Sequence, residues 1–140
     1  MSFREKSAWI MLTALLSGCL LYFTQIKSMS YSLGELAQPT IPIVIFFTVS
    51  LLLVAVVGHI IIAILSPKEA NASSDERERK IFDRAAHLSS HVFTTGVVLS
   101  LTLYLISYDG NMLFYGAFGS LILGQLAEYV FQIYFYRAAI

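Results

Sequence analysis

Charged residues are scarce in this sequence. Asp, Glu, Lys and Arg make up 13% of its 140 residues, whereas a soluble globular protein carries about a quarter. Hydrophobic residues make up 57% of the chain, so most of its surface must face something other than water. The formal net charge is zero, which leaves no overall basic field of the kind that favours nucleic-acid binding.

Cysteine and the short motifs of catalysis are also nearly absent. Cys19 is the only cysteine, so no internal disulfide can form. The chain has no glycine-rich phosphate loop, no zinc-protease motif, no Cys-x-x-Cys pair and no nucleophile elbow. It also has no polar stretch long enough for a soluble domain with a separate active site. These absences argue against an enzyme.

What the chain has instead is four long apolar runs. A helix that crosses a bilayer needs about 20 mostly apolar residues, and four runs qualify: 8–26, 41–65, 85–107 and 112–136. Backbone groups in lipid must be satisfied within the segment, which favours helices over strands. The sequence therefore predicts one integral membrane domain over residues 1–140. Its predicted fold is an all-α bundle of four transmembrane helices, with a charged loop and helix stem at 66–84.

Local signals mark the ends of these runs. Thr40 precedes Ile41 and Pro42, a suitable cap and first turn for the second helix. Ser66-Pro67 ends that helix, because proline disfavours helical backbone in the residue before it. The tetrad 108–111, Tyr-Asp-Gly-Asn, is rich in turn residues, so the third and fourth helices should form a tight antiparallel hairpin.

Basic residues predict the orientation. They gather before the first run, between the second and third, and after the fourth: Arg4, Lys6, Lys68, Arg77, Arg79, Lys80, Arg84 and Arg137. The two opposite loops hold only Lys27. The positive-inside rule then places both termini and the charged segment in the cytoplasm.

The charged segment itself reads DERERKIFDR from residue 75 to residue 84. Ser73 and Glu76 fit a capping box, so a helix should begin there and continue into the third apolar run. Pairs such as Glu76–Lys80 at i,i+4 spacing would add about 0.2–0.5 kcal/mol each. We interpret the segment chiefly as a solvated helical stem rather than a catalytic charge cluster.

Ionisable residues inside the apolar runs are the candidate site. His59, His91 and Glu128 lie on three different helices, at depths of roughly 9–12 Å below the same membrane surface at 1.5 Å per residue. Glu128 is the sharpest signal, because a carboxylate in lipid costs several kcal/mol unless it is paired or neutralised. Gln125 and Gln132 flank it at i−3 and i+4. For Glu128, a functional role and a structural role, in which it hydrogen-bonds neighbouring helices together, are about equally favoured.

A second pattern extends this candidate site. Asp83, His87 and His91 lie along one helical stripe at i, i+4 and i+8, and two histidines at that spacing can share a metal ion. Helix packing accounts for another pattern: Gly116, Ser120 and Gly124 repeat every fourth residue and allow close helix contact.

Residues 16–19, Leu-Ser-Gly-Cys, match the lipobox of bacterial lipoproteins and give a rival interpretation of the N-terminal run. The run stays apolar after Cys19, where a lipoprotein would turn polar. A transmembrane span is therefore the favoured interpretation.

The segment 75–81, Asp-Glu-Arg-Glu-Arg-Lys-Ile, resembles the charged signature of small uncharacterised bacterial inner-membrane proteins with four spans. In those families a D-E-R-E/D-x-x-I run leads into the third helix. The resemblance implies a bacterial cytoplasmic membrane. It implies no activity and no site residues.

Several functions stay open at this point. The first is a binding or sensory module in which His59, His87, His91 and Glu128 form a polar pocket in the cytoplasmic leaflet, with a transition metal as one possible ligand. The second is an oligomeric proton-coupled transporter of small molecules. The small multidrug transporters are similar in outline, but their acid lies in the first helix, where this chain has none.

Two further functions remain. One is a b-type haem held by His59 and His91 as axial ligands. The other is an accessory subunit that binds a larger membrane complex and has no chemistry of its own. The lipid bilayer is the partner common to all four hypotheses.

Overall fold

The computed structural model describes residues 3–65, 67 and 75–138, and this part of the chain is helical with no strand. The helices are α1 (Phe3–Leu33), α2 (Ile41–Leu65), α4 (Glu76–Ser107) and α5 (Gly110–Arg137). The predicted all-α class is confirmed. Helices α1, α2 and α4 are long and apolar enough to cross a membrane. Helix α5 has the length, at 28 residues, but no stretch of it reaches the same hydropathy.

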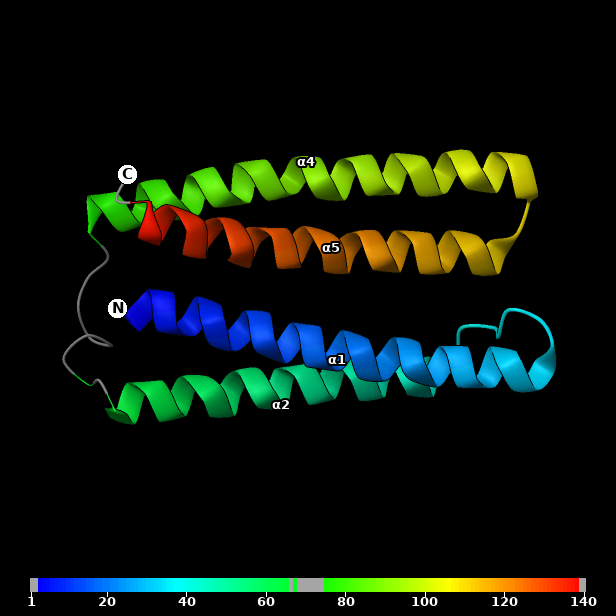
Figure 1. The fold of residues 1–140 in the computed structure, drawn as a ribbon, viewed down its shortest axis with the longest axis horizontal. Coiled ribbons are helices and arrows are strands. Elements are labelled where there is room, and N and C mark those ends of the chain that lie inside the picture. The colour runs from blue at the N-terminus through cyan, green and yellow to red at the C-terminus, as the bar shows by residue number, and fades with distance from the viewer. Residues whose placement is uncertain (1–2, 66, 68–74, 139–140) are drawn as a thin grey trace.

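The four helices form a bundle that is open on one side. Helix α4 packs on α5, α5 on α1, and α1 on α2, so the spatial order is α4–α5–α1–α2 (Figure 1). Helices α2 and α4 stand at the two ends of this row, and the described residues give them no interface of comparable extent. The first and last described residues lie at one end of the molecule, here called the terminal end (Figure 1). The opposite end, called the loop end, carries residues 34–40 and the turn at 108–109 (Figure 1).

The helix ends follow local signals with two differences from expectation. Helix α1 extends past the predicted span 8–26 in both directions, so residues 27–33 are helical rather than loop. Helix α2 begins after Thr40, as Thr40 and Pro42 predict, and is described as far as Leu65. Residue 66 lies outside the described residues and Pro67 is helical, so the predicted stop at Ser66-Pro67 is not confirmed. Helix α4 is capped by Asp75, whose carboxylate accepts the Glu76 N–H at 2.7 Å. The predicted cap, Ser73, lies outside the described residues.

The turn between α4 and α5 is shorter than the predicted tetrad. Tyr108 closes α4 in the left-handed region, with φ of 52°. Asp109 then caps α5, because its carboxylate accepts the N–H groups of Asn111 and Met112 at 2.8 and 3.3 Å. The predicted tight antiparallel hairpin therefore forms (Figure 1).

Small residues allow α4 and α5 to pack closely. A Cβ atom added at Gly116 would meet the Ser100 Oγ at 2.6 Å, and one added at Gly124 would meet the Phe93 Cβ at 2.8 Å. In the reverse direction, a Cβ at Gly96 would clash with Ser120. The Gly116, Ser120 and Gly124 stripe thus lies against α4, where larger side chains would force the helices apart.

Aromatic side chains fill the half of the molecule nearer the loop end. Tyr22, Phe47 and Phe118 come from α1, α2 and α5, and their ring centroids lie 5.2–5.7 Å apart. The Tyr115 hydroxyl donates to the Ala37 carbonyl at 2.9 Å and ties α5 to the loop before α2. Cys19 packs against this cluster in the middle of α1. This half of the bundle therefore has an apolar core.

Ion pairs join the helices at the terminal end. Arg4 of α1 lies 3.2 Å from Glu78 of α4, and Arg137 of α5 lies 3.5 Å from the buried Glu5 of α1. The predicted Glu76–Lys80 pair is present at 3.3 Å on the solvated face of α4. The charged stem at the start of α4 therefore does more than extend into solvent, because Glu78 links it to α1.

Candidate functional site

A polar cavity of about 460 Å³ opens where all four helices approach one another in the terminal half. Helices α1, α2, α4 and α5 each contribute to its wall. Its polar lining residues are Arg4, Ser7, His59, Glu128, Tyr129 and Gln132. We call this cavity the polar cleft. Two of the residues singled out by their depth in the sequence, His59 and Glu128, thus share one cavity although α2 and α5 are not neighbours in the row.

Glu128 occupies the α5 side of the cleft and is held by two amides. Gln125 donates to one carboxylate oxygen at 3.2 Å and Gln132 donates to the other at 3.1 Å. Gln132 is 3% exposed, so packing holds its side chain in place beside Glu128. Throughout the described part of the chain no basic side chain forms an ion pair with Glu128. The hydrogen bonds that its carboxylate accepts from described side chains come from these two amides.

His59 lines the same cleft from α2, and both of its ring nitrogens have partners. The Nδ1 lies 2.7 Å from the Ala55 carbonyl, and the Nε2 lies 2.6 Å from the Ser7 hydroxyl of α1. A carbonyl can only accept, so Nδ1 carries a hydrogen. In the neutral ring Nε2 then accepts from Ser7, and in the charged ring it donates to Ser7. The bond to α1 therefore exists in either protonation state.

Arg4 and Phe82 form the part of the cleft nearest the terminal end. The Arg4 guanidinium lies 5.5 Å from the centre of the Phe82 ring, a cation–π contact, while it also pairs with Glu78. Both residues line the cleft. Sequence reasoning missed Arg4 and Ser7 as site residues. Their i,i+3 spacing places them on one face at the start of α1, and this spacing could have indicated a shared site. The basic residues of this segment had been used only to predict orientation.

His87 and His91 do not join the cleft. Both side chains are exposed on α4, and their rings contact each other at a centroid distance of 4.8 Å. Asp83, the third member of the predicted stripe, is exposed as well. No group of three His, Cys, Asp or Glu side chains among the described residues is arranged to hold a metal ion. The four-residue pocket expected from the sequence therefore reduces to His59 and Glu128.

The same geometry does not support the haem hypothesis. Axial ligands must face each other across one iron, but His59 lines the cleft while His91 is exposed on α4 and outside it. Both nitrogens of His59 are also engaged by Ala55 and Ser7. The structure therefore does not bring the two histidines into a haem-binding arrangement.

Glu128 also lines a second cavity, of about 340 Å³, between α4 and α5. The polar residues around it are Ser89 and Ser90 of α4 and Gln125 of α5. Ser89 and Ser90 donate to carbonyls one turn back in their own helix, at 3.0 and 2.7 Å. The same carboxylate is thus reached from the polar cleft and from a separate cavity on the α4 side.

Comparisons with protein-family models, with curated proteins and with solved structures find no match to this chain.

Proposed function

We propose that the chain is a four-span membrane protein of the bacterial cytoplasmic membrane, with both termini in the cytoplasm. Helix α5 runs antiparallel to α4 and packs along its length, so if α4 spans the membrane, α5 spans it as well. Its lower hydropathy is consistent with its position, because α4 and α1 cover it where lipid covers α2. Arg4 lies in the first turn of α1, Lys80 and Arg84 in the first turns of α4, and Arg137 at the end of α5. These helix ends meet at the terminal end (Figure 1), which supports a cytoplasmic location for that end.

Reporter fusions test this topology. A fluorescent protein fused after Ile140 should fluoresce, because it folds in the cytoplasm, and alkaline phosphatase fused at the same point should be inactive. Fusions placed in the loop 34–40 should show the opposite pattern. Active phosphatase at the C-terminus would place that end outside the cytoplasm and contradict the proposal.

The function that the site supports best is the binding of a small cation in the polar cleft. The observation that carries it is Glu128: a half-buried carboxylate in a lipid-embedded helix, cradled by two amides, with no ion pair to a basic side chain in the described residues. A carboxylate at such depth is costly unless it is neutralised, so a positive ligand or a proton would stabilise it.

The neighbours of Glu128 indicate a protonated amine rather than a transition metal. The cleft offers one carboxylate, the Ser7–His59 pair and the aromatic side chains of Phe82 and Tyr129. Its lining also includes Arg4, whose guanidinium pairs with Glu78. An ammonium group needs acceptors and tolerates aromatic faces. A transition metal needs several nitrogen, sulfur or carboxylate ligands, and both nitrogens of His59 are already occupied. The volume of about 460 Å³ suits a small organic molecule.

A thermal-shift titration of the purified full-length protein tests this binding. Ethanolamine is a suitable probe, because ethylene glycol matches it in size and lacks the charge. We expect ethanolamine to raise the melting temperature of the wild type and ethylene glycol to leave it unchanged. The shift should disappear in Glu128→Gln, which keeps the size of the side chain, and persist in the control Glu35→Gln, an exposed residue of the loop end.

The two histidine substitutions give a second matched pair. His59→Phe should weaken the response to ethanolamine, since it removes the bond to Ser7 and reshapes the cleft. His87→Phe changes an exposed histidine outside the cleft and should leave the response intact. Equal responses to ethanolamine and ethylene glycol, or an undiminished response in Glu128→Gln, would refute the proposed cation site.

A proton-coupled transporter is the second candidate, and the cavity on the α4 side favours it. A carboxylate that is reached from two cavities can exchange a proton for a cation. In proteoliposomes with a pH gradient, ethanolamine should then drive proton movement that Glu128→Gln abolishes. Binding without proton movement would assign a binding module. The absence of both would favour the remaining alternative, an accessory subunit of a larger complex.

A further inference from the structure

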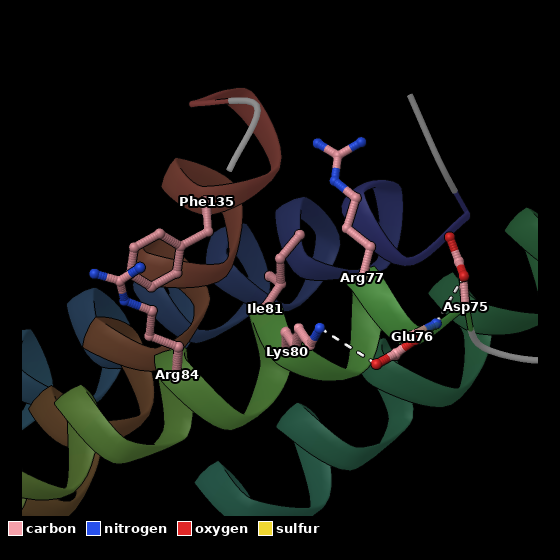
Figure 2. A pocket seen from close by; sticks show the side chains of 7 residues that line it. All are labelled: Asp75, Glu76, Arg77, Lys80, Ile81, Arg84 and Phe135. Carbon is pink, nitrogen blue, oxygen red and sulfur yellow. Dashed lines mark hydrogen bonds and ion pairs between the residues drawn. The ribbon is translucent and has the colours of Figure 1, made fainter.

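A second charged cavity lies apart from the polar cleft, at the start of the stem. Its volume is about 510 Å³, and it is formed by the first turns of α4 and the last turns of α5. Arg77, Lys80 and Arg84 line it from α4, together with Ile81, and Phe135 lines it from α5 (Figure 2). We call this cavity the basic cleft. None of these residues takes part in the site around Glu128.

The basic residues of this cleft follow the helical repeat. Arg77, Ile81 and Arg84 lie on one face of α4, and Figure 2 shows Ile81 between the two arginines. Lys80 lies one turn before Arg84, so the two side chains can approach the same anion. The Arg84 guanidinium lies over the Phe135 ring, 5.0 Å from its centre. Stacking fixes the plane of the guanidinium and leaves its edge available for hydrogen bonds.

The two carboxylates of the cleft have partners of their own. Asp75 caps α4 through the Glu76 N–H, and Glu76 pairs with Lys80 on a highly exposed part of the surface. An exposed pair of this kind is weak, so an anion can compete for Lys80. Arg84 makes no ion pair with any described carboxylate. The lining carries three cations and two acids, a formal charge of +1, which favours an anion. Arg77 and Lys80 have partners of their own, so Arg84 is the cation most open to a new one.

The floor of the cleft is apolar. Ile81 is 4% exposed and Phe135 is 5% exposed, and both belong to a cluster that continues toward the bilayer part of α4 through Ala85 and Leu88. The cleft thus has basic side chains at the surface and apolar side chains below them, at the point where α4 would enter the membrane. This arrangement complements a phospholipid. Its phosphate lies at the surface and its acyl chains lie below.

We propose that the basic cleft binds the phosphate of an anionic phospholipid of the membrane in which the protein lies. Lys80 and Arg84 hold the phosphodiester, and the first methylenes of the acyl chains rest against Ile81 and Phe135. The proposal is independent of the cation site at Glu128, because it requires only that the terminal end lie at a membrane surface.

Native mass spectrometry of the detergent-solubilised full chain tests the proposal. Dioleoylphosphatidylglycerol is the anionic probe and dioleoylphosphatidylcholine is the zwitterionic one. We expect one phosphatidylglycerol molecule to be retained at concentrations where phosphatidylcholine is not. Each basic residue near an anionic surface is worth about 1 kcal/mol, which is about fivefold in affinity. Arg84→Gln or Lys80→Gln should therefore lower the affinity about fivefold, and the double variant about 25-fold.

Two controls keep this result specific. Lys27→Gln removes one exposed positive charge from α1, outside the basic cleft, and should leave the affinity unchanged. Lys80→Gln alters a side chain that is 76% exposed, so the fold should be unaffected and loss of binding cannot be attributed to unfolding. Glycerol 3-phosphate, added as a soluble competitor, separates a lipid site from a site for free phosphate.

Three outcomes would overturn the proposal. The first is equal retention of the two lipids by the wild type. The second is an equal effect of Lys27→Gln and Arg84→Gln on the affinity for phosphatidylglycerol. The third is displacement of the lipid by glycerol 3-phosphate at matching concentration, which would assign the cleft to a soluble phosphate compound.

Discussion

Replacement of Gly124 by alanine is the sharpest test of how α4 and α5 pack. The new Cβ would lie 2.8 Å from the Phe93 Cβ and 3.4 Å from the Phe93 Cα. Because the Phe93 Cβ is bonded directly to the backbone, no change of rotamer can move it away. Ordinary contact begins at 3.4 Å, so the two helices must separate by the difference between 3.4 and 2.8 Å, which is 0.6 Å.

The cost can be bounded from that clash. Overpacking of a well-packed interface costs about 1–3 kcal/mol. Alanine also favours the helix over glycine by about 1 kcal/mol. The net change in the free energy of unfolding should therefore lie between about 0 and 2 kcal/mol, in the destabilising direction. Unfolding in mixed micelles with increasing dodecyl sulfate, followed by circular dichroism, measures this change.

Gly119 is the matched control within the same helix. A Cβ added there would have no atom within 4 Å, so Gly119→Ala should show only the gain in helix propensity. The difference between the two variants isolates the steric term, which we expect to be about 1–3 kcal/mol. If Gly124→Ala is as stable as Gly119→Ala, α4 and α5 do not approach as closely as described, and the packing argument is wrong.

Three further predictions concern single contacts. Asp109→Ala removes the cap of α5 and should lower the free energy of unfolding by about 1 kcal/mol in the same micelle assay. Tyr115→Phe removes the hydrogen bond to Ala37 and should cost about 1 kcal/mol, with helix content unchanged by circular dichroism. A double-mutant cycle of Arg4→Gln and Glu78→Gln should give a coupling below about 1 kcal/mol that falls as salt is added. A coupling energy that does not change with salt concentration would show that solvent does not screen the Arg4–Glu78 pair.

Much of the fold could be predicted from the sequence, because the constraints that set it are local. Length and hydropathy locate the helices, Thr40 and Pro42 mark the start of α2, and the turn residues at 108–111 predict the hairpin. The partners of Glu128 could also be predicted, since residues at i−3 and i+4 on one helix must lie beside it.

The arrangement around each helix axis could not be predicted in the same way. Counting residues from the end of a helix gives a position along the bundle, and by that count His59 and Glu128, which line one cavity, were grouped together. Rotation about the axis requires an amphipathic pattern, and α2 is apolar nearly all the way round. The residue count therefore placed His91 with His59 and Glu128, although His91 lies outside the polar cleft. Ser7 was missed because the lead of α1 resembled a solvated basic segment.

Helix α2 is attached to the rest of the molecule chiefly through α1, and most of its circumference would be surrounded by acyl chains. In a bilayer its tilt would therefore be set as much by bilayer thickness as by protein contacts. Since α2 carries His59, any change in that tilt moves one wall of the cleft relative to Glu128. The same protein in a thicker or thinner membrane would present a narrower or wider cavity, so lipid composition would adjust its affinity for a ligand.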